Sequence, residues 1–310
     1  MAERRIDEAT GTQTMGHEWD GIEELNTPLP RWWVLTFYAS ILFAIGYCVV
    51  YPAIPLANKG TEGMWGWTSR AQLASEKTQG DAQHAAVMAA LATTPVEQLA
   101  SNPELLKNAV AGGKAAFRVN CVQCHGSGAA GSKGFPNLND DDWLWGGDIK
   151  TIETTILHGI RSPDDAATRN SMMPSFGKDG ILTAAQVGDV ANHVLSLSGK
   201  APANAAGQAI FAANCVACHG PDGKGSRQFG APNLTDAIWL YGGAKADVVA
   251  SVTNAHAGVM PAWGAKLNPA TVKMLAAYVH SLGGGEDFAP AADASAPAAA
   301  APAAAATITA

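Results

Sequence analysis

Charged residues are scarce in this chain of 310 residues: they make up 15% of it, and the formal net charge is −7. Lys and Arg together number 20, against 27 Asp and Glu. Proteins that bind nucleic acid present a dense basic surface, so this balance argues against nucleic acid as a partner. The charge is also uneven, because residues 1–31 hold three basic and seven acidic residues, whereas residues 200–285 hold six basic and three acidic.

Cysteine is scarce as well, and its placement narrows the chemistry. Four of the five cysteines fall in two copies of one pattern, Cys-Val-Gln-Cys-His at 121–125 and Cys-Val-Ala-Cys-His at 215–219. A lone Cys-x-x-Cys fits a zinc half-site or a redox pair. A zinc site needs further paired Cys or spaced His ligands, and the remaining cysteine, Cys48, cannot supply them. We assign Cys48 no function.

Cys-x-x-Cys-His is the attachment pattern of haem c. The two thiols bond to the vinyl groups of one haem, and the adjacent imidazole ligates the iron from the same side. The sequence therefore predicts two covalently bound haem c groups. The predicted attachment residues are Cys121, Cys124, Cys215 and Cys218, and the predicted axial histidines are His125 and His219.

A Met-Pro dipeptide follows each motif after roughly 40–50 residues, at Met173 and Met260. Proline disfavours a helical conformation of the residue before it, which leaves each thioether on a loop that can reach an iron. A neutral, soft thioether favours ferrous iron and raises its reduction potential, which suits an electron carrier. We therefore predict Met173 and Met260 as the distal axial ligands.

Other residues compete for the distal positions. Met172 precedes Met173, but only Met173 aligns with Met260 in the repeat described below. His158 and His256 could give a bis-histidine haem, yet they do not occupy equivalent repeat positions. The repeat suggests that each methionine serves the haem of its own domain, and the sequence leaves open an exchange between the two.

One long apolar run is present. Residues 32–51 contain no charged side chain, and ~20 helical residues at ~1.5 Å each cross the ~30 Å hydrocarbon layer of a membrane. Trp32 and Trp33 at one end, and Tyr47 and Tyr51 at the other, match interfacial aromatic belts. A cleaved signal peptide is the alternative, but the preceding 31 residues are long and acidic. We predict a single uncleaved anchor that holds the protein at a membrane lipid bilayer.

The soluble part contains an internal repeat. Residues 113–121 match 207–215, Trp-Leu-Trp-Gly-Gly at 143–147 matches Trp-Leu-Tyr-Gly-Gly at 239–243, and Met-Pro-Ser-Phe at 173–176 matches Met-Pro-Ala-Trp at 260–263. The first copy has about nine extra residues before its methionine, which we interpret as a surface loop. The predicted regions are a polar N-terminal tail (1–31), the anchor (32–56), a connector (57–112), cytochrome domain 1 (113–199), cytochrome domain 2 (204–284) and a disordered Ala/Pro-rich tail (285–310).

Both repeats share one coarse plan. Helices over 113–119 and 207–213 lead into the haem motifs, helices near 149–158 and 246–254 follow a Gly-rich loop, and closing helices show apolar residues at 3.6-residue spacing. With their Cys-x-x-Cys-His motifs, Met-Pro loops and flanking helices, the paired domains resemble class I cytochromes c. The resemblance implies an all-α fold: one N-terminal transmembrane helix followed by two tandem class I cytochrome c domains.

The segment Asp-Gly-Ile-Glu-Glu-Leu-Asn-Thr-Pro-Leu-Pro-Arg-Trp-Trp at 20–33, entering a single span, resembles the N-terminus of the dihaem subunit of cbb3-type cytochrome c oxidases, the family called CcoP or FixP. Gly-Trp-Thr-Ser-Arg at 66–70 is similar to the same family. The resemblance covers residues 17–285. It implies an electron-transfer subunit without a catalytic site of its own, in a proton-translocating terminal oxidase that reduces O₂.

The resemblance also implies partners and a location. The partners are the catalytic and monohaem cytochrome subunits of the oxidase, and a donor cytochrome c or bc1 complex. The location is the bacterial inner membrane. Cytochrome c maturation takes place on the oxidising side of that membrane, so we expect the N-terminus in the cytoplasm and the haem domains in the periplasm.

Two other functions compete with this interpretation. One is a dihaem electron-transfer subunit of another respiratory complex, against which the 20–33 segment argues. The other is a dihaem peroxidase or a haem gas sensor, each of which needs an open iron position. Two matched Met-Pro loops instead predict two closed, six-coordinate irons.

Overall fold

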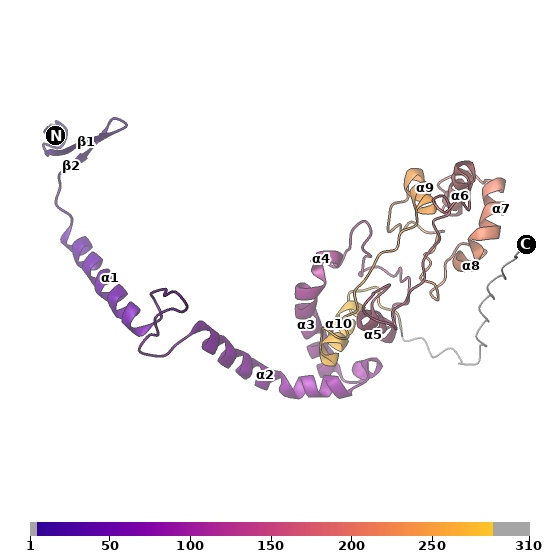
Figure 1. The fold of residues 1–310 in the computed structure, drawn as a ribbon, viewed down its shortest axis with the longest axis horizontal. Helices are drawn as coiled ribbons and strands as arrows, with labels where there is room; N and C mark the ends of the chain where they lie inside the picture. The colour runs from indigo at the N-terminus through magenta and orange to yellow at the C-terminus, as the bar shows by residue number, and fades with distance from the viewer. Residues whose placement is uncertain (1–4, 288–310) are drawn as a thin grey trace, which may run out of the picture. The chain divides into compact units, whose positions relative to one another are not determined.

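The computed structural model describes residues 5–287 and divides them between two compact units, the first ending at Gln83 and the second beginning at His84. From residue 288 onward the predicted Ala/Pro-rich tail lies outside the described residues. Helices dominate both units in Figure 1, and a two-stranded hairpin is the only sheet in the described part of the chain. This architecture agrees with the predicted all-α fold.

The first unit begins with an antiparallel hairpin, β1 (Thr14–Trp19) and β2 (Ile22–Leu25). Its turn residues, Asp20 and Gly21, have φ values of 50° and 84°, as the two-residue turns of hairpins require. We expected only a polar tail here. Asp-Gly between short alternating segments is the signal that could have predicted the hairpin.

Helix α1 (Arg31–Val50) follows, and it is the one helix in residues 5–287 that is long and apolar enough to cross a membrane. Pro30 precedes it and fixes the chain in an extended conformation, and Tyr51 ends it in an extended conformation just before Pro52. None of its residues is buried within the structure. An apolar helix without a protein cover fits the predicted lipid-facing anchor.

The predicted connector is largely helical. It contains α2 (Ser69–Thr93) and the 3₁₀ helix η1 (Val96–Ser101), and then α3 (Pro103–Asn120) begins. Helix α3 starts ten residues before the predicted position 113. The Asn102 side chain accepts a hydrogen bond from Leu105 N, and Pro103 occupies the first helical position, so both are start signals that the sequence prediction missed.

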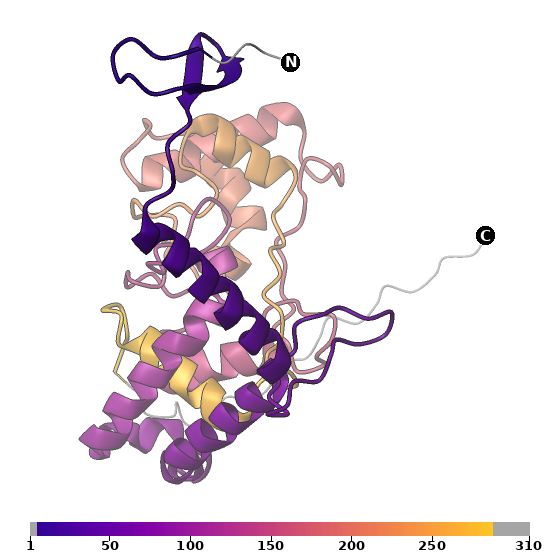
Figure 2. The same ribbon diagram turned by 90° about the vertical axis from the view of Figure 1, so that its left-hand side faces the viewer.

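Two helical cores make up the second unit. The first core combines α3 with α5 (Ile149–His158) and α10 (Pro269–His280), and the second combines α6 (Ala184–Leu197), α7 (Ala205–Asn214) and α9 (Lys245–Thr253). The short helices α4 (Val122–His125) and α8 (Val216–His219) carry the haem motifs. In Figures 1 and 2, α10 lies beside α3, and Figure 1 shows α6 beside α7.

These packing partners cross the sequence repeat. Helix α10 closes the second repeat but packs on α3 of the first, and α6 closes the first repeat but packs on α7 of the second. Only residues 198–204 separate α6 from α7, and helices joined by so short a link pack as antiparallel neighbours. Each core is therefore built from both repeats. The predicted ranges 113–199 and 204–284 describe the two copies of the repeat in the sequence, and neither range corresponds to one core.

Glycine allows both helix pairs to approach closely. A Cβ placed on Gly113 of α3 would lie 1.9 Å from the carbonyl oxygen of Met274 in α10. At the matching position of the second repeat, a Cβ on Gly207 of α7 would lie 2.1 Å from the carbonyl oxygen of Asp189 in α6. Any side chain at either position requires the paired helices to move apart.

Replacing Gly113 with alanine should therefore separate α3 from α10. We expect the free energy of unfolding to fall by about 1–3 kcal/mol or more, because the added methyl group overlaps backbone rather than a flexible side chain. Denaturant titration of the haem-loaded protein measures this change.

The matched control is Gly188→Ala in α6, where no atom lies within 4 Å of the added Cβ. Alanine favours a helix over glycine by about 0.5–1 kcal/mol, so this variant should be as stable as the parent or more stable. Equal effects of the two substitutions would contradict the close α3–α10 contact.

Candidate haem-binding sites

The first motif lies on a helical turn that continues directly from α3. Cys121 ends α3 and begins α4, which runs to His125 and is followed by Gly126 with φ 77°. Residues three and four apart share a face of a helix. Cys121, Cys124 and His125 are therefore grouped on one side, as one haem requires.

The second motif repeats this geometry. Cys215 ends α7 and begins α8, and Gly220 follows His219 with φ 75°. All five cysteines of the chain are free thiols in the structure. Both pairs of thiols are thus available for thioether bonds.

A backbone carbonyl orients each histidine ring. His125 Nδ1 lies 3.2 Å from the carbonyl oxygen of Pro136, and His219 Nδ1 lies 3.1 Å from that of Pro232. When Nδ1 carries the proton and donates it to the carbonyl, Nε2 keeps a free lone pair for a metal. From the sequence alone, these two prolines were not identified as the residues that orient the histidines.

Burial sets the protonation of these groups. It lowers the pKa of His125 and His219, while the hydrogen bond to the proline carbonyl opposes this more weakly, and the lowered pKa favours the neutral imidazole. Burial also raises the pKa of Cys121 and of Cys215 to about 11, with a smaller contribution from the second thiol of each motif. A neutral imidazole is the form that ligates iron.

The structure packs each predicted methionine against the core that also holds the motif of the other repeat. Met260 packs against the first core, together with Cys121 and Val122. Met173 packs against the second core, together with Cys215 and Val216. The exchange of α6 and α10 therefore carries the Met-Pro segments with it.

Backbone hydrogen bonds hold the Met260 segment against the end of α5. Ile160 N donates to Met260 O at 2.9 Å, and Met260 N donates to Ile160 O at 3.0 Å. Gly159, with φ 65°, comes close enough that a Cβ there would lie 2.2 Å from Met260 O. The Met173 segment contacts the end of α9 in the corresponding way, through Lys178 N and Thr253 O at 2.9 Å.

The rival residues have other surroundings. Met172 is 63% exposed and lies outside both cores. His158 Nδ1 lies 3.0 Å from an Asp165 carboxylate oxygen, and the His256 ring stacks on Tyr241 with 3.9 Å between ring centroids. Met172 is thus an exposed residue, and each histidine ring has a side-chain partner of its own.

The two tryptophans that match in the repeat differ in one hydrogen bond. Trp143 Nε1 donates to the carbonyl oxygen of Gly284 at 2.5 Å, whereas Trp239 Nε1 is buried without a hydrogen-bond partner among the described residues. A buried donor without an acceptor costs about 1–3 kcal/mol. Haem carries propionate groups that can accept a hydrogen bond, so the unpaired Trp239 N–H is consistent with a haem beside the second core. The thiols, imidazole and thioether at that core are also the groups that haem c requires.

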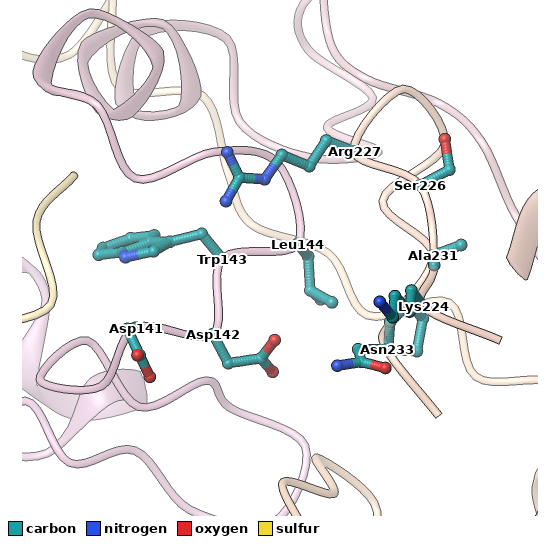
Figure 3. Close-up of a pocket in the computed structure, with 11 residues that line it drawn as sticks. Asp141, Asp142, Trp143, Leu144, Lys224, Ser226, Arg227, Ala231 and Asn233 are labelled. Carbon is teal, nitrogen blue, oxygen red and sulfur yellow. The ribbon is translucent and has the colours of Figure 1, made fainter. Parts of the chain in front are cut away.

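A cavity of about 260 Å³ lies between loops of the two repeats. Asp141, Asp142 and Trp143 line one side of it, and Arg227 and Asn233 lie on the other (Figure 3). Burial, assisted by Asp236, Asp140 and Asp141, raises the pKa of Asp142 to about 6, and Arg227 opposes the shift. Arg227 itself pairs with Glu286.

Because folding raises the pKa of Asp142, the native protein binds this proton more tightly than the unfolded chain. The contribution of Asp142 to stability is therefore most favourable below about pH 4 and is lost as the pH rises to about 6. Asp142→Asn should stabilise the protein at pH 7 and leave it unchanged near pH 4. Denaturant unfolding of the haem-loaded protein across this range measures the difference.

Asp164→Asn, the same charge change at an exposed loop position, is the control and should not reproduce this pH dependence. A stability difference for Asp142→Asn that stays constant from pH 4 to pH 7 would contradict the assignment.

Comparison with protein families matches three segments of the chain. A profile for the N-terminal domain of cytochrome oxidase-cbb3, FixP, matches residues 11–58. A cytochrome c profile matches residues 110–198, and a profile for cytochrome c oxidase, cbb3-type, subunit III matches residues 202–279. The two cytochrome matches confirm the two predicted cytochrome c domains and their haem c cofactors.

Curated relatives resemble the chain over most of its length. A protein of Azorhizobium caulinodans named Cbb3-type cytochrome c oxidase subunit FixP is 54% identical over 285 residues, which cover 91% of this chain and 96% of the relative. A protein of the same name from a Bradyrhizobium species is also 54% identical, covering 91% and 98%. Subunit CcoP of Cereibacter sphaeroides is 53% identical, covering 88% and 95%.

Proposed function

The chain belongs to the FixP/CcoP family of cbb3-type cytochrome c oxidase subunits, and we propose that it accepts electrons from a donor cytochrome and passes them through two haems toward the monohaem and catalytic subunits. It is a membrane-anchored electron-transfer component of the oxidase complex. Reduction of O₂ takes place on other subunits in this proposal. The donor is a cytochrome c or a bc1 complex.

The proposed ligands follow from the two cores. Cys121 and Cys124 would hold the first haem, and His125 and Met260 would ligate its iron. Cys215 and Cys218 would hold the second haem, and His219 and Met173 would ligate its iron. Each haem c supplies an iron that gains and loses one electron.

The protein residues around each haem have distinct roles in this proposal. The proline carbonyls fix the orientation of each imidazole and leave Nε2 free to ligate an iron, and the thioethers would exclude water and other ligands from the iron. A thioether ligand favours the reduced state and raises the potential relative to a second imidazole. Closed iron positions suit electron transfer and disfavour a peroxidase.

The proposed orientation rests on the attachment chemistry. Haem c is attached on the oxidising side of the membrane, so the two haem-bearing cores lie in the periplasm and the N-terminal hairpin in the cytoplasm. Helix α1 is the crossing in this proposal, since it is the one helix among residues 5–287 that is long and apolar enough to span a membrane. The membrane is the bacterial inner membrane, and the partners in it are the other oxidase subunits.

The ligand exchange is testable in chains that carry one haem. In a chain with Cys215→Ser and Cys218→Ser, only the first haem is attached. Adding Met260→Ala should open that haem to CO and lower its potential, because the iron loses its thioether, whereas adding Met173→Ala should leave it closed.

The reciprocal chain, with Cys121→Ser and Cys124→Ser, should show the opposite response to the two methionine substitutions. CO difference spectra and redox titrations read both results. Opening of the first haem by Met173→Ala would mean that each methionine serves its own repeat.

The electron-transfer role is tested on the whole complex. An oxidase isolated through this chain should contain the catalytic and monohaem subunits and should consume O₂ when reduced donor cytochrome is supplied. With all four motif cysteines replaced by serine, O₂ consumption from the donor should be lost. A small reductant that reaches the catalytic subunit directly should still support it. Unchanged O₂ consumption from the donor would refute the proposed electron path.

A further inference from the structure

One arginine side chain contacts both methionine segments. Arg161 Nε donates to the carbonyl oxygen of Gly258 at 2.7 Å, and Arg161 Nη1 donates to that of Ser171 at 2.8 Å. Gly258 lies two residues before Met260, and Ser171 lies two residues before Met173. A single guanidinium therefore joins the two segments that the proposed function assigns to different irons.

The backbone at this position lies where the exchanged segments cross. Ile160 forms an antiparallel bridge with Met260 and a parallel bridge with Arg169, and Arg161 N donates to Arg169 O at 2.7 Å. Arg161 has φ 51°, a left-handed conformation that is unfavourable for a residue with a Cβ. Such a conformation persists only where the surrounding contacts determine it. Here those contacts are the hydrogen bonds to both methionine segments.

The charge of Arg161 is not used in an ion pair with any carboxylate of residues 5–287. Its guanidinium is half-buried, and this burial lowers its pKa. The side-chain hydrogen bonds that it donates end on the two backbone carbonyls. Hydrogen bonds from a charged donor are about twice as strong as neutral ones, so the guanidinium suits a clamp between two loops.

An arginine at this position occurs in only one of the two repeats. His158 aligns with Asn254, so the position that matches Arg161 in the second repeat is Ala257. The extra loop around 163–170 is likewise confined to the first repeat. One arginine of the first repeat thus contacts both methionine segments, without a symmetric partner.

We propose that Arg161 is a positioning residue that holds the Met173 and Met260 segments together, so that closure of the two irons is coupled through one side chain. This inference rests on the proposed function, in which both methionines are axial ligands. Loss of the clamp loosens both segments at once, whereas loss of one methionine opens one iron.

The test uses the full-length, haem-loaded chain in detergent. Arg161→Ala should raise the fraction of each haem that binds CO by roughly tenfold, which corresponds to about 1.4 kcal/mol per haem. The near-infrared charge-transfer band of methionine-ligated ferric haem should weaken by matching amounts. Arg161→Lys, which retains the charge without the forked donors, should restore closure in part.

Arg169→Ala is the matched control. Arg169 is a half-buried arginine of the same loop that lies over the Trp145 ring, and its side-chain hydrogen bond goes to the Thr155 hydroxyl rather than to a backbone carbonyl beside Met173 or Met260. Both haems should stay closed in this variant. Equal opening by Arg169→Ala would show a general loosening of the loop and overturn the assignment to Arg161.

Two further results separate the clamp from the proposed ligation. If Met173→Ala and Met260→Ala each open one haem while Arg161→Ala opens none or only one, the ligation stands and the coupling is wrong. If neither methionine substitution opens a haem, the proposed ligands are wrong, and the proposed role of Arg161 in positioning them is wrong as well. If Arg161→Ala does not accumulate, Arg161→Lys must show partial opening of both haems, and full closure of both would overturn the proposal.

Discussion

The contact between α3 and α10 determines which core each methionine packs against. Helix α3 carries the first motif at its end, and α10 follows the Met260 segment directly. Because Gly113 lets the two helices touch through backbone, Met260 is drawn to the core that contains Cys121. The same close contact between α6 and α7, through Gly207, brings Met173 to the core that contains Cys215.

This exchange makes the two cores mutually dependent. The helices α3 and α10 are separated by nearly the whole haem-bearing part of the chain, so the first core cannot close until the last helix is available. Contacts between residues far apart in sequence slow folding, because the intervening chain must be ordered first. In the proposed ligation, attachment of haem to the first motif and closure of its iron would therefore be separate events during folding. Through the proposed contacts of Arg161 with both methionine segments, closure of one iron would also depend on closure of the other.

The chemistry of the sites could be predicted from the sequence because few residue types can perform it. Covalent haem attachment needs Cys-x-x-Cys-His, and a loop thioether is a suitable sixth ligand, so the motifs and Met-Pro segments identified the candidate residues. Two matched repeats, however, present equivalent helix faces, and α10 could pack on α7 or on α3 with the same apolar pattern. Only the packing itself distinguishes the two, and so the sequence left the pairing of Met173 and Met260 open. Arg161 was missed because its role depends on two carbonyls from distant segments, whereas the N-cap at Asn102 and the Asp20-Gly21 turn were readable local signals.

The measurement that tests the exchange most directly is the proximity of each methionine methyl group to a particular haem. In the reduced full-length chain labelled with ¹³C at the methionine methyl groups, ligated methyls are shifted strongly by the haem ring current and can be assigned by substituting one methionine at a time. The account predicts nuclear Overhauser contacts between the Met260 methyl and the haem bonded to Cys121 and Cys124, and between the Met173 methyl and the haem bonded to Cys215 and Cys218. Contacts of Met260 with the haem of Cys215 and Cys218 would contradict it.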